Sequence, residues 1–378
     1  MTKINTEIEA FLTKHGKRNG VPISAITALK RFGVFDAQVL TVLSVEEIHR
    51  IPNISERTAQ ALKQVVSEKL GGVLFQQGTK YIETRLKTRK YFTTGAKSVD
   101  KLLDGGLRTG TLIEVAGDSR SGKTQFCMTC AVTAQLPEED GGLNSPVIYI
   151  DTTNSFDVQH YLRIGERFRL KQEDLLKNLI IVKADRLMLL KQALDRLPGY
   201  MQAMDAKLVV VDSFIAPYEH EHPMFIESEV VQKEFNHKLG LLKRLATGFN
   251  SVVIITNHVI ANLQQSRMFI PVLIAGGHAF THTTDLRLFF KKLRGNMRRV
   301  KVEHCSWLPM EHEDFYITPR GIYDEEVFPE ELLHRKKVQT ETEEESLEYP
   351  LMEALKEIAE LEVEAKPSKS KNAQKKVK

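Results

Sequence analysis

One eight-residue segment constrains the fold of this chain more than any other. Residues 117–124 read GDSRSGKT, which matches the phosphate-binding pattern G-x-x-x-x-G-K-[ST] at every fixed position. The segment follows the apolar run LIEVAG and opens a stretch of helical character. Because this pattern binds phosphate between a strand and the N-terminus of a helix, its surroundings predict a P-loop in an α/β fold.

Each residue type in this loop has a chemical reason. Gly117 and Gly122 let the backbone approach phosphate oxygens, beside the partial positive charge of a helix N-terminus. Lys123 is expected to reach the β- and γ-phosphates. Thr124 and Asp212, which ends the run LVVVD, are expected to hold Mg²⁺. The sequence thus predicts ATP and Mg²⁺ as ligands, with a nucleotide site of Gly117, Asp118, Ser119, Arg120, Ser121, Gly122, Lys123 and Thr124.

Short β-branched runs recur through the middle of the chain. They are nearly continuous in apolar residues, as in strands covered on both faces. The runs are LIEVAG (112–117), VIYID (147–151), LIIVK (179–183), LVVVD (208–212) and SVVIIT (251–256). Residues 228–247 carry one apolar stripe at helical spacing. Two later runs, 285–291 and 298–304, flank Gly295-Asn296 and predict a hairpin. Together they predict an α/β core with a mostly parallel sheet over residues 92–323.

The N-terminal part has a different pattern. Residues 1–70 predict a small helical domain, in which the turn IPNIS at 51–55 resembles that of a helix-hairpin-helix unit. Asn53 stands where glycine is usual, and Asn tolerates the left-handed backbone that such a turn needs. The turn either approaches a nucleic-acid phosphate or serves only as a structural cap. Residues 71–91 predict a linker with a basic stretch.

The C-terminal part, residues 324–378, predicts a tail that builds no core. Residues 341–364 carry ten Glu and one Lys, whereas the last thirteen residues carry six Lys and no acid. Segments of this composition bury too little apolar surface to order themselves, so we expect the tail to be disordered. Its lysines are expected either to bind DNA without sequence preference or to act as a nuclear import signal.

Composition limits the class of protein. The chain has 378 residues, a net charge of +4 and three cysteines. No apolar run approaches the roughly 18 residues that a membrane span needs, and the N-terminus lacks a signal-peptide core. We therefore expect an intracellular protein with no membrane partner. Cys127 and Cys130 form a C-x-x-C, but no second cysteine pair completes a zinc site, so we expect core residues.

Five segments of the core form a set that can be compared with known families. They are FTTGAKSVDKLLDGGLRTGTLIEVAGDSRSGKTQ, QLPEEDGGLNSPVIYIDT, LVVVDS, IITN and the GGH at 276–278. The set resembles the RecA-like recombinases of archaea and eukaryotes, the RadA-like strand-exchange proteins, over residues 36–323. The resemblance implies a RecA-like P-loop core behind a small helical domain. It also implies ATP-dependent filaments on single-stranded DNA, which pair that strand with a homologous duplex.

The resemblance also implies a contact between subunits. In that family a motif F-x-x-A precedes the core, and its Phe enters a pocket on the next subunit. The segment FQQG at 75–78 is similar: Phe75 matches the motif, and Gly78 replaces its Ala. A buried aromatic anchor contributes a few kcal/mol to an interface. Phe75 is thus expected to dock on a recombinase or paralogue subunit, unless it packs on its own domain.

Other positions depart from the family pattern. Thr153 in IDTTNSF stands where the family places a catalytic Glu, so no catalytic base is identified. The γ-phosphate-sensing Gln of the family corresponds to His258, which can donate a hydrogen bond. His160 stands in place of an Arg near the adenine. His304 and Ser306 replace a carboxylate and a proline that cap the neighbouring subunit's ATP.

The first DNA-binding loop departs as well. Family members carry three Arg there, and the matching positions are Glu219, Phe225 and Val231. The whole stretch 213–232 contains no Arg or Lys, so the sequence does not support phosphate contact by this loop. His220 and His222 in the same stretch fit an exposed loop better than a metal site. Cations recur instead in the predicted hairpin, where Arg294, Arg298 and Arg299 are candidates for binding DNA, single-stranded DNA above all, or for a solvated face.

Three functional hypotheses follow. The leading one is a divergent recombinase paralogue that binds ATP and Mg²⁺, hydrolyses ATP weakly and assists a recombinase filament in homologous recombination and DNA repair. The second is an active DNA-dependent ATPase that catalyses strand exchange. The third is an ATP-dependent switch or scaffold unrelated to DNA. The location would be the nucleus in a eukaryote or the cytoplasm in an archaeon.

Overall fold

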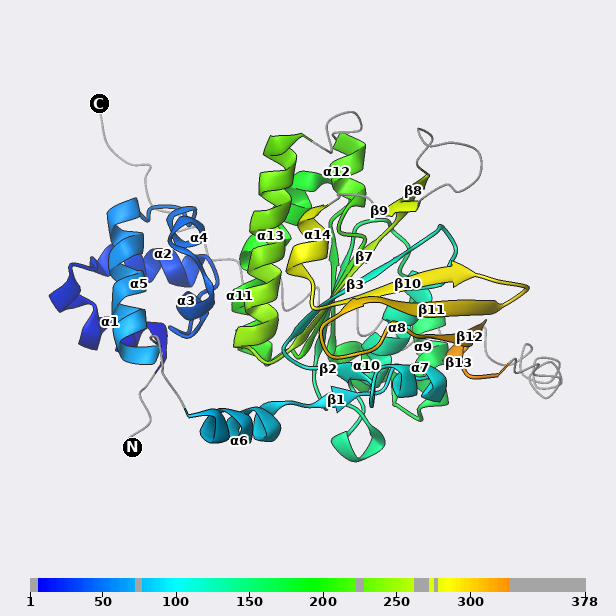
Figure 1. Ribbon diagram of the computed structural model, residues 1–378. Helices are drawn as coiled ribbons and strands as arrows, with labels where there is room; N and C mark the ends of the chain where they lie inside the picture. The colour runs from blue at the N-terminus through cyan, green and yellow to red at the C-terminus, as the bar shows by residue number, and fades with distance from the viewer. Residues whose placement is uncertain (1–5, 72–76, 222–227, 262–271, 275–277, 326–378) are drawn as a thin grey trace, which may run out of the picture. The chain divides into compact units, whose positions relative to one another are not determined.

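The computed structural model describes residues 6–71, 77–221, 228–261, 272–274 and 278–325 (Figure 1). The predicted N-terminal helical region is confirmed. It contains α1 (Ile8–His15), η1 (Lys17–Asn19), α2 (Ile23–Arg31), α3 (Val39–Val42), α4 (Val45–His49) and α5 (Glu56–Leu70). Ser44 forms a capping box with Glu47 at the start of α4, and Ser55 caps α5. Between these helices Asn53 has a φ of 66°, the left-handed conformation expected of it.

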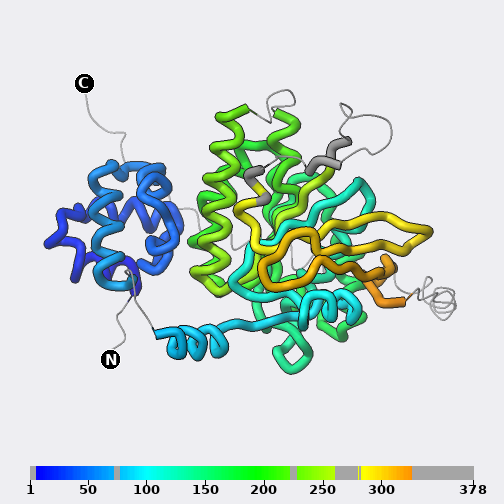
Figure 2. Tube along the Cα trace, viewed as in Figure 1, coloured from blue at the N-terminus to red at the C-terminus, as the bar shows by residue number. Residues whose placement is uncertain are grey.

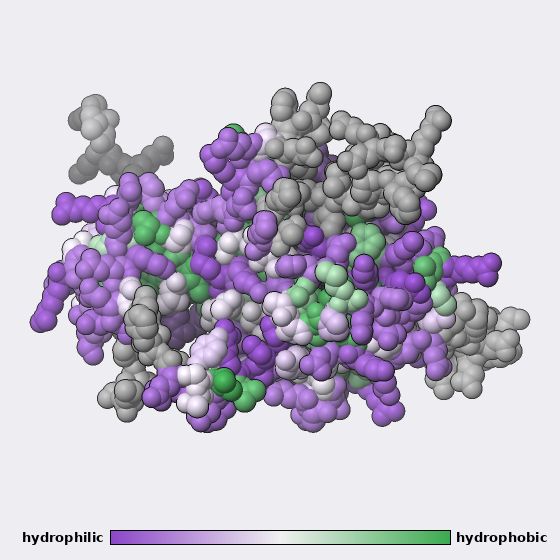
Figure 3. Space-filling model, in the orientation of Figure 1, coloured by the Kyte–Doolittle hydropathy of each residue, from purple (hydrophilic) through white to green (hydrophobic). Residues whose placement is uncertain are grey.

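A further helix, α6 (Gly78–Thr88), lies in the segment expected to be a linker. None of its residues is buried, and the space-filling view shows a small hydrophobic patch over it (Figure 3). Its exposed apolar side chains are Tyr81, Ile82 and Leu86. In proteins most helical stability comes from packing an apolar face, and the described residues do not cover this one.

The core is built on a sheet of nine strands among the described residues. Its strand order is β13-β12-β11-β10-β3-β7-β6-β4-β5. The strands from β10 to β5 in this order are parallel, and β11, β12 and β13 continue antiparallel. This confirms the predicted α/β core with a mostly parallel sheet. The strands are β3 (Thr111–Gly117), β4 (Val147–Asp151), β5 (Leu179–Lys183), β6 (Leu208–Asp212), β7 (Val252–Asn257), β10 (Leu286–Lys292), β11 (Met297–Cys305), β12 (His312–Thr318) and β13 (Gly321–Tyr323).

Helices cover both faces of the sheet (Figure 1). On one face α11 (Leu187–Met204), α12 (Ala216–Glu221), α13 (Glu229–Gly248) and α14 (His278–Thr283) pack on alternate strand residues. On the other face lie α7 (Lys97–Leu102), α8 (Lys123–Thr133), α9 (Val158–Arg167) and α10 (Gln172–Lys177). In β6, for example, Val209 and Val211 face the first layer, whereas Leu208 and Val210 face the second. Burial on both faces explains why these strands are uninterrupted in apolar residues.

Shorter elements complete the core. The pair β1 (Tyr91–Phe92) and β2 (Leu107–Arg108) is antiparallel, as is the pair β8 (Val259–Ala261) and β9 (Val272–Ile274). A 3-10 turn, η2 (Glu138–Asp140), follows α8. The predicted hairpin is confirmed as β10 and β11, which extend together from the body of the sheet (Figure 2).

The strand β5 corrects one expectation. The sequence LIIVK predicts a strand covered on both faces, but β5 is an edge strand whose side chains are only half-buried or exposed. Its apolar character therefore has another reason. A groove of about 460 Å³ runs beside it, lined by apolar residues of β4, β5 and α11. An apolar edge strand next to an apolar groove is a surface that another chain can extend.

Candidate nucleotide and effector site

The P-loop and the other predicted nucleotide residues gather at one edge of the sheet. β3 ends at Gly117, β6 ends at Asp212, and β7 lies between these strands and ends at Asn257. Asn257 pairs in register with Ala116. Because the carboxyl ends of parallel strands meet at one edge, the P-loop, the carboxylate of Asp212 and the residue after β7 are neighbours.

Backbone geometry explains both glycines of the loop. Gly117 has a φ of 153°, and a Cβ atom there would lie 2.2 Å from the carbonyl oxygen of Phe290. Gly122 has a φ of 101°, and its Cβ atom would lie 2.8 Å from Ile317 Cδ1. Any other residue would displace the loop from β10 or β12. Helix α8 begins directly after Gly122, so its free N–H groups point toward the loop.

Lys123 is held inside the loop. Its Nζ donates hydrogen bonds to the carbonyl oxygens of Gly117 at 2.7 Å and Asp118 at 2.8 Å. Burial lowers the pKa of the Lys123 ammonium, and the nearby Asp212 and Asp118 oppose that shift. The hydroxyl of Ser121 is fully buried and has no hydrogen-bond partner among the described residues. A partly desolvated cation and an unpaired buried hydroxyl in one loop fit an oxygen-rich anion.

Asp212 is fixed through both carboxylate oxygens. The hydroxyl of Tyr149 donates to Oδ2 at 2.9 Å, and the hydroxyl of Thr256 donates to Oδ1. The hydroxyl of Thr124 and this carboxylate are the oxygen donors that Mg²⁺ prefers, so the residues present fit that ion. No group of three or more His, Cys, Asp or Glu that could hold a metal occurs in the described ranges. A P-loop site needs none, because phosphates and water complete its coordination.

The segment after β4 has no carboxylate at the expected catalytic position. Thr153 is exposed, and its hydroxyl lies 2.8 Å from the Ser155 hydroxyl. The nearest acidic residue in sequence, Asp151, is 3% exposed. Its carboxylate accepts hydrogen bonds from the backbone N–H groups of Thr153, Ser155 and Phe156 at 3.1 to 3.2 Å. Asp151 therefore shapes this turn and is not available to take a proton from water.

His258, the predicted phosphate sensor, follows β7 directly. Its Nε2 lies 2.8 Å from Glu219 Oε2, and its backbone N–H donates to Asn257 Oδ1. The Asn257 amide in turn donates to the buried carboxylate of Glu114, which pairs with Arg287 at 2.7 Å. Burial raises the pKa of Glu114, and the Arg287 guanidinium opposes that shift. The sensor position is thus connected to β3, β10 and α12.

The hairpin cations have different surroundings. Arg298 is only 7% exposed, donates to the carbonyls of Gly295 and Met297, and lies beside Gly122 of the P-loop. Arg299 forms a two-pronged ion pair with Asp314. Arg294 is exposed in the turn. Of these three candidates for DNA contact, the structure therefore gives two a role within the protein.

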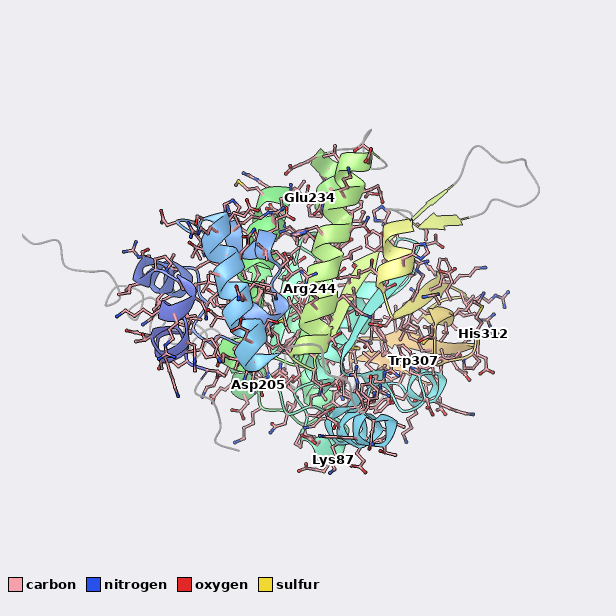
Figure 4. All side chains as sticks on the ribbon, turned by 60° about the vertical axis from the view of Figure 1, so that its left-hand side comes forward. Lys87, Asp205, Glu234, Arg244, Trp307 and His312 are labelled. Carbon is pink, nitrogen blue, oxygen red and sulfur yellow. The ribbon has the colours of Figure 1, made fainter. Side chains whose placement is uncertain are left out.

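The segment after β11 presents the two residues expected near a neighbour's ATP. His304 and Ser306 are exposed. Trp307, labelled in Figure 4, fixes this segment, because the guanidinium of Arg108 lies 3.4 Å from its ring centroid and the ring packs on the core.

Several other positions of interest are not exposed. His160 is 8% exposed, and burial lowers its pKa. Cys127 and Cys130 are buried thiols in α8, and burial raises their pKa, in keeping with core residues. Gly78 begins α6. Phe75 and His222 lie outside the described residues, as do Phe225 and the tail from residue 326 onward.

Three features of the site escaped the sequence analysis. These are the Glu219–His258 contact, the buried Glu114–Arg287 pair and the two hydroxyls that hold Asp212. The charged residues are spread over 173 positions of sequence in the case of Glu114 and Arg287, so spacing carries no signal for them. An acid inside an apolar strand, as at Glu114, is the one indication that the sequence offers.

The comparison with known families agrees with this site. The sequence matches the family model described as Rad51 over residues 86–325, which contain the P-loop, Asp212 and His258. Proteins of this family bind ATP with Mg²⁺, act as DNA-binding oligomeric filaments and serve recombination and repair. No helix among the described residues is long and apolar enough to cross a membrane. With its RecA-like α/β core behind a helical N-terminal region, the chain belongs to the Rad51 family.

Proposed function

We propose that this chain is a divergent recombinase paralogue that binds ATP and Mg²⁺, hydrolyses ATP slowly and assists a recombinase filament. One observation carries this proposal. A complete P-loop with its lysine and Asp212 lies beside a turn in which Thr153 replaces the carboxylate expected for catalysis. The chain therefore retains the groups that hold a nucleotide and lacks the group that would activate water.

ATP binding is supported by the buried cation and the glycine backbone of the loop. In full-length protein with Mg²⁺, a fluorescent ATP analogue should bind, and Lys123→Ala should weaken binding by roughly 30- to 100-fold, because a charged hydrogen-bond partner of the phosphates is lost. Lys101→Ala, on an exposed part of α7, is the matched control. Unchanged affinity in Lys123→Ala would sink the site assignment.

Slow hydrolysis is supported by the state of the nearby acids. Asp151 is bound to three backbone N–H groups, Asp212 to two hydroxyls, and Glu219 to His258. A general base must have a lone pair directed at the water whose proton it takes. None of these three carboxylates satisfies that condition without giving up its present contacts.

Assembly with another recombinase or paralogue subunit is supported by the groove beside β5. Ile148 and Ile150 of β4, Val182 of β5, and Leu189 and Ala193 of α11 line it. We assign to it the segment around Phe75 of another subunit of this family. An aromatic ring suits an apolar groove of this size, and the open edge of β5 offers backbone groups to an extended segment. Helix α6, which follows that segment, also leaves an apolar stripe uncovered.

DNA contact is assigned to the cations of the β10–β11 hairpin. Lys291, Lys292, Arg294 and Lys301 are exposed there, with no salt-bridge partner among the described residues. The described part of the loop after β6 contributes Glu219 and Glu221 instead. Single-stranded DNA would therefore bind through phosphate contacts on the hairpin, with further cations in the tail.

The active strand-exchange enzyme remains the second candidate function. The complete P-loop and the firmly held Asp212 favour it, because a protein that uses nucleotide only as a passive ligand has less need of a metal-positioning carboxylate. ATP turnover with and without single-stranded DNA separates the two candidates.

A further inference from the structure

One contact at the nucleotide edge has no role in the function proposed so far. Glu219 Oε2 lies 2.8 Å from His258 Nε2, and the two side chains are 24% and 35% exposed. Glu219 comes from α12, just after the strand that carries Asp212, and His258 follows the strand next to it. A partly exposed pair of this kind contributes little to folding stability, so packing does not account for its place beside the P-loop edge.

Helix α12 is anchored on two sides, which fixes Glu219. The buried ring of Tyr218 lies 4.5 Å from the ring of Phe235 in α13, in an edge-to-face arrangement. On the other side, the carboxylate of Glu221 accepts the backbone N–H of Leu187 at the start of α11, at 3.0 Å. A short helix with both neighbours engaged holds its side chains in defined directions.

His258 is anchored through its backbone. Its N–H donates to Asn257 Oδ1 at 2.8 Å, and the Asn257 amide donates to the buried Glu114 at 2.9 Å. Asn257 itself pairs with Ala116, one residue before the P-loop glycine. With the backbone fixed on the P-loop side and Glu219 fixed on α12, the contact between them determines the orientation of the imidazole ring.

The two ring nitrogens of a histidine are chemically distinct, and the partner of one decides what the other can do. A carboxylate only accepts hydrogen bonds, so Nε2 carries the proton shared with Glu219. The nitrogen left for a second ligand is Nδ1. We propose that Glu219 is a positioning residue: it holds His258 through Nε2, offers Nδ1 to the γ-phosphate, and thereby sets the preference for ATP over ADP. This inference rests on the proposed function, because it requires ATP at the P-loop.

The inference gives the loop after β6 a task other than DNA contact. A carboxylate in this place adds negative charge near a polyphosphate, and by charge alone it would oppose ATP. By contact it would favour ATP, because it fixes the ring that meets the γ-phosphate. The two effects have opposite signs, so variants that separate charge from reach can distinguish them.

The experiment measures the dissociation constants of fluorescent ATP and ADP analogues for the full-length protein with Mg²⁺. Glu219→Asp keeps the charge but is one methylene too short, and it should lower the ATP-over-ADP preference by about tenfold. Glu219→Gln loses the charge but keeps an oxygen of the same reach, and it should stay within about threefold of the parent. The reverse pattern, with Gln raising the preference and Asp leaving it unchanged, would overturn the inference.

A double-mutant cycle tests whether Glu219 acts through the ring. His258→Ala should lower the preference about as much as Glu219→Asp, and the two changes together should lower it no further. Glu229→Asp and Glu229→Gln, on the exposed end of α13, are matched controls and should leave both affinities unchanged. ADP affinity reports the intact fold in every variant.

The remaining outcomes separate this inference from the proposed function. If Lys123→Ala binds both nucleotides as tightly as the parent, the ATP site itself is wrong. If ATP binding requires Lys123 but the parent shows no preference for ATP, the inference fails and the site stands. The inference also fails, with the site intact, if Glu219→Asp weakens ATP and ADP equally, or if its effect persists in the His258→Ala background.

Discussion

The loops that follow β3 and β6 are neighbours at one sheet edge and have opposite characters. The loop after β3 is determined by backbone: Gly117 and Gly122 have positive φ angles, and neither has room for a Cβ atom. The described part of the loop after β6 is determined by side chains, with a buried Tyr218, two acids and no cation. A phosphate site made by backbone tolerates little change, whereas a DNA surface made by side-chain charge can be lost or replaced one residue at a time.

The same contrast separates binding from hydrolysis. The groups that would hold ATP are present and anchored, but the turn after β4 ends its carboxylate chemistry at Asp151, whose oxygens are engaged by three backbone N–H groups. A nucleotide that binds firmly and turns over slowly serves well as a ligand that joins subunits. The experiments below attempt to break this separation, or to make it sharper.

The largest effect is expected from restoring a carboxylate at position 153. Thr153→Glu places a base in an exposed position beside the P-loop edge, and ATP turnover should rise by roughly 10²-fold or more, because a general base typically contributes 10²–10⁴-fold. Turnover is measured as released inorganic phosphate, with and without single-stranded DNA.

Thr153→Gln is the matched control for length and polarity, and it should leave turnover unchanged. The comparison of binding with hydrolysis breaks down if the unmodified protein already hydrolyses ATP as fast as an active recombinase. In that case another group activates water, and the strand-exchange enzyme becomes the better description.

How much of this could be read from the sequence depends on the kind of interaction. The P-loop, the strands and the long helix α13 follow from local patterns, and the structure contains each of them, with Val231, Phe235 and Leu239 buried as the stripe requires. The half-exposed β5 does not follow, because an edge strand that binds another chain is as apolar as a buried one. Pairs such as Glu219 and His258 depend on tertiary placement, which no spacing reveals.

A smaller effect is expected at the groove beside β5. Phe75→Glu would bring a charge to an apolar groove, and its association with another subunit should weaken by about 30-fold or more. On the groove side, Ile181→Glu should have the same effect, because Ile181 lines the groove and is 37% exposed, which limits the cost to folding. Sedimentation of the protein, alone and with a recombinase, measures both.

Met188→Glu is the control for the groove. Met188 is on α11 and 59% exposed but is not among the residues that line the groove, so its change should leave association intact. If Phe75→Glu and Ile181→Glu both assemble as the parent does, the docking assignment is refuted, and Phe75 packs within its own subunit.

The smallest effect is expected on the salt dependence of DNA binding. Lys291 and Lys301 are exposed on the hairpin, where Lys291 pairs with Arg299 and Lys301 with Phe289 across the two strands. Each phosphate contact on a single strand contributes about 0.7 to the slope of log affinity against log salt concentration. Changing both lysines to Ala should therefore reduce that slope by about 1.4, which anisotropy of a labelled oligonucleotide measures at several salt concentrations.

Three further variants locate the DNA surface. Removing residues 366–378 should flatten the slope as well, because six lysines are lost with them. Arg298→Ala should leave the slope unchanged, since the guanidinium is bound to backbone carbonyls beside the P-loop and does not face solvent. Lys171→Ala, an exposed cation far along the chain from the hairpin, controls for net charge. If the hairpin and tail changes do nothing while His220→Ala abolishes binding, DNA contacts the loop after β6 without any cation there, and the contrast between the two loops no longer describes the molecule.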